Sequence, residues 1–169
     1  MDTVSQAVRS RIMASVRTKN TGPELLLRKA LHRLGLRFRL HARGLPGSPD
    51  IVFPKFKAVV FVHGCFWHAH GCRLSTVPST RIRFWKDKFL ANTHRDRRNA
   101  AMLASAGWRV ATVWQCALKP RQNVSSAIAG RIERWLAGGR KRLEIPASLS
   151  TPAPRRPRPT MVPNRNTKG

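Results

Sequence analysis

Residues 63–72, HGCFWHAHGC, place three histidines, two cysteines and two aromatic rings within ten positions. The spacing C-x4-H-x-C, with one further cysteine far along the chain, gives this candidate ligand set: Cys65, His70, Cys72 and Cys116. Three thiolates and an imidazole suit a closed tetrahedral zinc site, which fixes a loop that has no core of its own. His68 competes with His70 for the fourth position, and buried, inert thiols are the alternative to a metal site.

The charge of the chain indicates what it binds. There are 33 Lys and Arg residues against seven acids in 169 residues, a formal net charge of +26. This excess favours a polyanionic partner, nucleic acid before an anionic membrane surface or another acidic partner. No apolar run reaches the ~20 residues of a membrane span, and MDTVSQAVRS lacks the apolar core of a signal peptide. We therefore expect a cytoplasmic protein with reduced thiols.

Hydrophobic periodicity predicts an α/β fold with a small mixed sheet flanked by helices. The expected helices cover residues 3–17, 21–34, 80–106 and 122–137. The expected strands cover residues 36–41, 51–53, 58–62 and 108–114, of which the second and third form a hairpin. The third helix has a candidate break near residues 92–94, and a capping box opens the second at Thr21 and Glu24.

The composition changes after residue 137. Prolines and basic residues dominate residues 138–169, and Glu144 is the only acid among them. Such a segment is not expected to bury enough apolar surface to order itself, so we interpret it as a flexible basic tail. The predicted organisation is one domain over residues 1–137, whose residues 1–20 form an N-terminal arm, followed by this tail.

The hairpin gives a candidate catalytic site. If residues 54–57 form its turn, Asp50 lies opposite Phe61, and His63 lies diagonally on the same face, ~7–8 Å away. An acid at the head of a hairpin, Glu24 on a preceding helix and a basic surface are typical of a magnesium-dependent nuclease of the PD-(D/E)xK type. The second strand lacks the usual acid and lysine, so the Val62 carbonyl and His63 or His68 are the candidate replacements. The alternatives are that Asp50 is a turn residue and Glu24 a capping residue.

Aromatic rings beside cations suggest contact with bases. Phe66 and Trp67 lie in a stretch without core periodicity, and a second set shares one face of the third helix: Trp85, Lys88, Asn92 and Arg95. Rings in such company can wedge between base steps. The three remaining tryptophans are expected in the core: Trp108, Trp114 and Trp135.

Four motifs together carry a family resemblance: LPGSPDIVF, FVHGCFWHAHGC, TRIRFW with RDRR, and GWRVATVWQCAL. Over residues 5–137 the chain resembles the very-short-patch-repair mismatch endonucleases of bacteria. The resemblance implies a restriction-endonuclease-like core with a structural zinc. It also implies nicking of one strand of double-stranded DNA, 5′ of the thymine in T:G mismatches that arise by deamination of 5-methylcytosine.

The same resemblance implies roles for residues. Asp50 and the Val62 carbonyl hold magnesium, and Glu24 contacts metal-bound water. His68 lies near the scissile phosphate with Asp96 as its partner and His63 close by. The implied zinc ligands are Cys65, His70, Cys72 and Cys116. The implied DNA contacts are of two kinds. Four residues would wedge into the DNA beside the mismatch: Phe66, Trp67, Trp85 and Met13. Two residues would read the mismatched pair: Lys88 and Asn92.

The resemblance also implies a monomer that works at the bacterial nucleoid with mismatch-repair proteins and a DNA polymerase. It says nothing about residues after 137. Two alternatives stay open from the sequence. One is a zinc-stapled DNA-binding module that does not cleave, and the other is a restriction-type endonuclease that acts on intact duplex.

Overall fold

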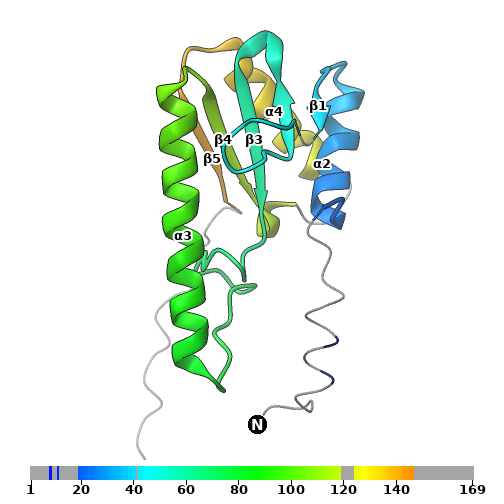
Figure 1. Cartoon of the computed structure of the whole chain (residues 1–169). Helices are drawn as coiled ribbons and strands as arrows, with labels where there is room; N and C mark the ends of the chain where they lie inside the picture. The colour runs from blue at the N-terminus through cyan, green and yellow to red at the C-terminus, as the bar shows by residue number, and fades with distance from the viewer. Residues whose placement is uncertain (1–7, 9–10, 12–18, 41, 119–123, 147–169) are drawn as a thin grey trace, which may run out of the picture.

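A five-stranded mixed sheet organises the protein, in a computed structural model that describes residues 8, 11, 19–40, 42–118 and 124–146 (Figure 1). The strands, in spatial as in chain order, are β1 (Arg39–Leu40), β2 (Ile51–Phe53), β3 (Ala58–His63), β4 (Arg109–Trp114) and β5 (Arg142–Ile145). The helices are α2 (Gly22–Arg33), α3 (Ile82–Ser105) and α4 (Val124–Ala137), with single 3-10 turns η1 (Pro54–Phe56) and η2 (Gln115–Ala117). The expected mixed sheet with flanking helices is therefore confirmed.

The register of the hairpin agrees with the sequence. β1, β2 and β3 are antiparallel, and Phe53 pairs with Ala58 and Ile51 with Val60. β3, β4 and β5 run parallel, so the carboxyl ends of β3 and β4 lie at one edge of the sheet. Because β2 runs the opposite way to β3, the residue that precedes β2 lies at this same edge.

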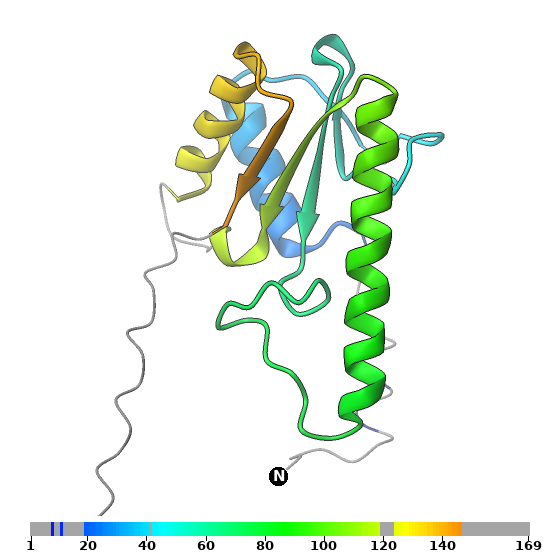
Figure 2. The ribbon, with the colours of Figure 1, turned by 90° about the vertical axis from the view of Figure 1, so that its left-hand side faces the viewer.

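Helices cover both faces of the sheet (Figure 2). Alternate strand residues point to opposite faces. One set packs with α2 and α4 in the larger core, which includes Leu27, Val60 and Ile132. The other set packs under α3 around Val59 and Leu103.

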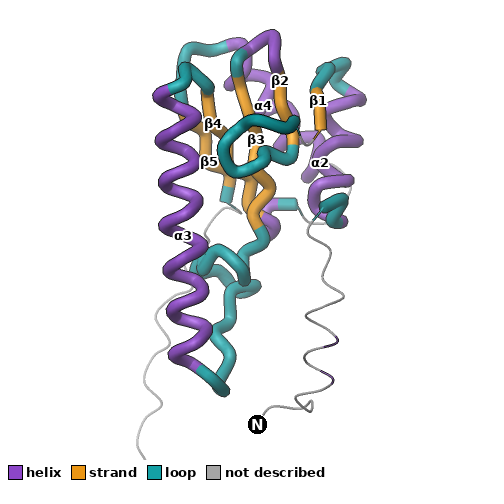
Figure 3. Tube along the Cα trace, in the orientation of Figure 1, coloured by secondary structure: helices purple, strands orange, loops and turns teal. Residues whose placement is uncertain are grey.

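Helix α3 is continuous, so the break considered near residues 92–94 is wrong. The segment contains neither Pro nor Gly, and its polar side chains do not disrupt the helix. Thr93 Oγ1 donates to the Phe89 carbonyl within the helix, and Asn92 Nδ2 donates outward to the Trp67 carbonyl. The lower half of α3 runs beside the long loop that follows β3 (Figure 3).

The strand expected over residues 36–41 is shorter than predicted. Backbone pairing with β2 covers only β1, both of whose residues are exposed, and Leu40 is 43% exposed. Leu36 and Phe38 nevertheless pack against the larger core, as the alternation indicated. These two side chains therefore attach the segment before β1 to the core.

The boundary placed at residue 137 is wrong, because β5 belongs to the sheet. Arg142, Leu143, Glu144 and Ile145 pair in parallel with β4, and Ile145 is 1% exposed. Two apolar side chains at alternate positions are enough to bury one face of an edge strand. Of the helix expected over residues 3–17, the structure describes only Val8 and Arg11, both of them helical, and Met13 and the tail from residue 147 onward lie outside the described residues. None of the described helices is long and apolar enough to cross a membrane.

Candidate active site and metal centre

A cleft of about 1370 Å³ lies at the edge of the sheet where β3 and β4 end. It is lined by residues from the head of α2, the head of β2, the loop after β3, the middle of α3 and strand β5. All of the residues predicted for catalysis or for magnesium line it: Glu24, Asp50, Val62, His63, His68 and Asp96. Ligands of open α/β sheets bind at this kind of edge.

Asp50 lies at the head of the hairpin, as predicted. Its Oδ2 accepts a hydrogen bond of 2.7 Å from the backbone N–H of Val62, which holds the carboxylate against β3. Burial raises the pKa of Asp50 to about 6, and the charge of Glu24 adds to this, although the Val62 hydrogen bond opposes it. An ionised Asp50 is therefore costly in this position until a cation compensates it.

Glu24 is a buried capping residue beside Asp50, 2% exposed. Its Oε1 accepts from the backbone N–H and the hydroxyl of Thr21, and its Oε2 accepts from the Asn20 N–H and from Arg28 at 2.7 Å. Arg28 also donates to the Asn20 side chain. The capping interpretation of Glu24 thus holds, and Glu24 is also one of the residues that line the cleft.

His68 and Asp96 meet across 28 positions of sequence, because α3 passes beside the loop after β3. His68 Nδ1 forms a hydrogen bond with Asp96 Oδ2. The ring of His63 stacks on that of His68 with centroids 4.0 Å apart and planes 4° apart. Burial and the neighbouring His68 lower the pKa of His63 to about 4, so it is neutral at pH 7. Burial alone would raise the pKa of Asp96, but the His68 hydrogen bond and nearby positive charges hold it below its ordinary value.

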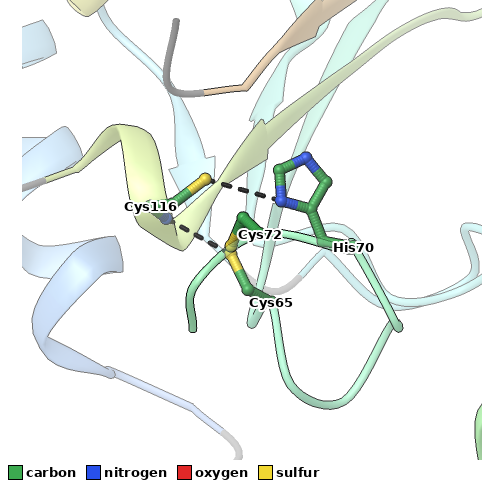
Figure 4. Close-up of side chains that lie close together, drawn as sticks. All are labelled: Cys65, His70, Cys72 and Cys116. Carbon is green, nitrogen blue, oxygen red and sulfur yellow. Dashed lines mark hydrogen bonds between the residues drawn. The ribbon is translucent and has the colours of Figure 1, made fainter. Parts of the chain in front are cut away.

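The four predicted zinc ligands come together at the end of β3 and in η2 (Figure 4). One ligand atom from each of Cys65, His70, Cys72 and Cys116 lies within 4.8 Å of the others. The Cys116 N–H donates to Cys65 Sγ at 3.3 Å, and Cys116 Sγ lies 3.5 Å from His70 Nδ1. This donor set fits a Cys3His zinc site. Of the two histidines that the sequence offers as the fourth ligand, His70 belongs to the set. His68 lies instead in a second group, with His63 and Asp96.

The aromatic residues form one cluster between the loop and α3. Phe66 contacts the rings of Trp67, Trp85 and Phe89 at centroid distances of 5.1, 5.2 and 5.3 Å. Phe66 and Trp67 are half-buried, whereas Trp85 is 7% exposed. Lys88 is exposed and lines the cleft. Asn92 is buried, and its side-chain amide donates a hydrogen bond to the Trp67 carbonyl.

Two features of the site were missed in the sequence. Trp114 was expected in the core, but it is half-buried and lines the cleft, with its Nε1 donating to Glu144 Oε1 at 2.7 Å. Strand alternation could have found it, since Val113 belongs to the core and the next residue must face the other way. Arg28 also went unnoticed, although its i+4 spacing from Glu24 on a helix predicts their ion pair.

Comparison with known proteins gives the family. The family model described as DNA mismatch endonuclease Vsr matches residues 1–74. The DNA mismatch endonuclease Vsr of Escherichia coli is 43% identical over 138 residues, which are 81% of this chain and 88% of that protein. The chain belongs to the Vsr family of DNA mismatch endonucleases. This confirms the resemblance that the motifs carry.

Nicking enzymes are also among the relatives. The type II nicking enzyme V.XorIIP of Xanthomonas oryzae is 55% identical over 117 residues, 69% of this chain and 86% of that protein. The type II nicking enzyme V.NmeAIP of Neisseria meningitidis is 41% identical over 118 residues, 70% of this chain and 84% of that protein. Family membership thus makes the chain an endonuclease and DNA its substrate.

Proposed function

We propose that this protein nicks one strand of duplex DNA, 5′ of the thymine in a T:G mismatch, and so begins the repair of deaminated 5-methylcytosine. Membership in the Vsr family carries the proposal. The geometry supports it, because the half-buried carboxylate of Asp50 and a histidine–carboxylate pair line one cleft of a strongly basic chain.

We propose magnesium as the catalytic cation, held by Asp50 and the Val62 carbonyl. The donor set fits, since a hard cation prefers oxygen ligands and compensates a carboxylate whose ionised form is otherwise penalised by burial. A magnesium ion here would neutralise charge on the scissile phosphate and make a bound water more acidic. Zinc, in contrast, would be structural, because Cys65, His70, Cys72 and Cys116 leave no open position.

We assign the proton transfer to His68. Its Nδ1 is engaged with Asp96, which orients the ring and leaves Nε2 as the nitrogen able to take a proton at the phosphate. Neutral His63 stacks on this ring and keeps its plane fixed without adding positive charge. Glu24, whose carboxylate is fixed by Arg28, would orient water near Asp50.

The aromatic cluster is the proposed wedge. Phe66 and Trp67 are partly accessible and would enter the base stack directly. Trp85 supports them from α3 and would reach DNA only if the cluster opened. Lys88 lies exposed on the cleft surface, where it would read the mismatched pair, and Asn92 would first have to release the Trp67 carbonyl. Met13 remains a proposed contact outside the described residues.

We further propose a monomer that acts in the bacterial cytoplasm on nucleoid DNA and hands its nick to mismatch-repair proteins and a DNA polymerase. The catalytic domain would extend through β5 to residue 146, and the basic residues beyond it would strengthen salt-sensitive, non-specific binding.

The decisive experiment uses two end-labelled duplexes that differ only in a T:G or a C:G pair, with magnesium. Wild type and Asp50→Ala are compared on each. One nick 5′ of the thymine, made only by wild type and only on the mismatch, is the expected result. Retained binding without cleavage in several sequence contexts would favour a binding module, and equal cleavage of both duplexes would favour a restriction-type enzyme.

A further inference from the structure

Trp114 lies between the metal centre and the catalytic histidines. Its ring stacks on His70, with centroids 4.0 Å apart and planes 18° apart. Its other contacts are edge-to-face, with His63 at 5.4 Å and His68 at 6.3 Å. The indole therefore joins the zinc-ligand ring to the pair of stacked histidines in one continuous group of rings.

Strand β5 supplies the group that fixes this indole. Glu144 pairs with Thr112 in the register of β4 and β5, so its side chain lies on the cleft face beside Trp114. The hydrogen bond from Trp114 Nε1 to Glu144 Oε1 sets the rotation of the ring about its side-chain bond. Packing against flat rings does not by itself decide which way the edge of the indole with the N–H points, whereas a directed N–H bond does.

The position of Glu144 is unfavourable for DNA binding. It is one of seven acids in a chain of net charge +26, and it lies in the cleft that must receive phosphates. A carboxylate there repels the substrate, so its contact with Trp114 is its evident contribution.

We propose that Glu144 and Trp114 form a positioning pair, through which strand β5 orients the rings of His63 and His68 relative to the Cys65–His70–Cys72–Cys116 cluster. The catalytic step of the proposed function depends on where His68 Nε2 points, so this inference rests on that function. Neither residue touches the reacting atoms; they act on His68 through ring contacts.

The test compares Glu144→Ala, Glu144→Gln and Trp114→Phe in full-length, zinc-loaded protein on the T:G duplex. Glu144→Ala should lower kcat three- to tenfold without raising KM. Glu144→Gln keeps an acceptor oxygen, so its kcat should stay close to that of wild type. In the Trp114→Phe background, which lacks the N–H, Glu144→Ala should have no further effect. Glu133→Ala is the matched control, because it removes an exposed glutamate of α4 and changes the net charge equally.

A second readout separates this inference from the proposed function. In NMR spectra of isotope-labelled protein without DNA, Glu144→Ala should shift the Trp114 indole N–H resonance and the ring resonances of His63 and His68. The zinc content should stay at one ion per chain. Unchanged histidine resonances, or a kcat loss that Glu144→Gln does not relieve, would overturn the positioning role. Loss of zinc in Glu144→Ala would also overturn it, since the pair would then serve metal retention. A wild type that cleaves nothing refutes the proposed function alone and leaves the resonance test valid.

Discussion

Replacing Asp50 by Asn should make the protein more stable while abolishing cleavage. The folded protein raises the pKa of Asp50 from 3.8 to about 6, chiefly by burial. A tenfold change in an equilibrium constant corresponds to ~1.4 kcal/mol, so the ionised carboxylate costs ~3 kcal/mol of folding stability at neutral pH. Asn carries no charge and still accepts the Val62 N–H through its amide oxygen. Because a buried amide has its own desolvation cost, we expect a net gain of about 1–3 kcal/mol.

The sign of this effect fixes its pH dependence. The folded-state pKa of Asp50 is raised above its unfolded value, near 4. Below pH 4 the carboxyl is protonated in both states, and there it destabilises the folded protein least. As pH rises from there to about 6, the unfolded chain ionises while the folded protein keeps the proton, so stability relative to Asp50→Asn falls. The advantage of the variant should therefore be complete at pH 7.5 and smaller by about 1.4 kcal/mol at pH 5, by the linkage relation.

Urea unfolding followed by tryptophan fluorescence, in magnesium-free buffer with zinc bound, measures this difference. Asp87→Asn is the matched control, because Asp87 is an exposed acid of α3 for which the same substitution should change stability little. Adding magnesium should then stabilise wild type and not Asp50→Asn, since only the former holds the cation. An Asp50→Asn protein that is no more stable than wild type at pH 7.5, or whose advantage does not change with pH, would refute the reasoning.

Three further predictions concern separate parts of the molecule. His68→Ala should slow single-turnover cleavage by about 10²- to 10⁴-fold at unchanged DNA affinity; cleavage near the wild-type rate would remove His68 from proton transfer. Cys72→Ser should lose zinc by metal analysis and melt at a lower temperature, because one of four ligands is gone; full zinc content would exclude the Cys3His site. Ile145→Ala should cost about 2–4 kcal/mol in urea unfolding, because the side chain is 1% exposed; a loss below about 0.5 kcal/mol would show that β5 contributes little.

Local patterns predicted the hairpin well. Its turn leaves only one register that keeps the apolar residues of both strands facing inward, and the structure pairs Phe53 with Ala58 as expected. The capping box at Thr21 and Glu24 is equally local, since both partners lie within one helical turn. Such features depend on neighbours in the sequence, and so they can be worked out from it.

Long-range pairing was harder to predict. Strand β5 lies in a segment whose composition indicates disorder, and its pairing with β4 joins residues about 30 positions apart. The alternation of Leu143 and Ile145 is the only local sign of it, and two residues are a weak pattern. The contact of His68 with Asp96 was supplied by the family resemblance, because it depends on how α3 packs against the loop.

The position of the Cys/His cluster shows what a structural metal would do for the proposed active site. Cys65 follows β3 and Cys116 follows β4, so the candidate zinc ligands begin at the same sheet edge as Asp50. Asp50 is held directly by the backbone of β3, but His68 lies in a loop with no regular secondary structure of its own. A metal that tied Cys65, His70 and Cys72 to η2 would fix that loop on both sides of His68. The sheet therefore positions the carboxylate, and a bound metal, with Trp114, would position the histidine relative to it.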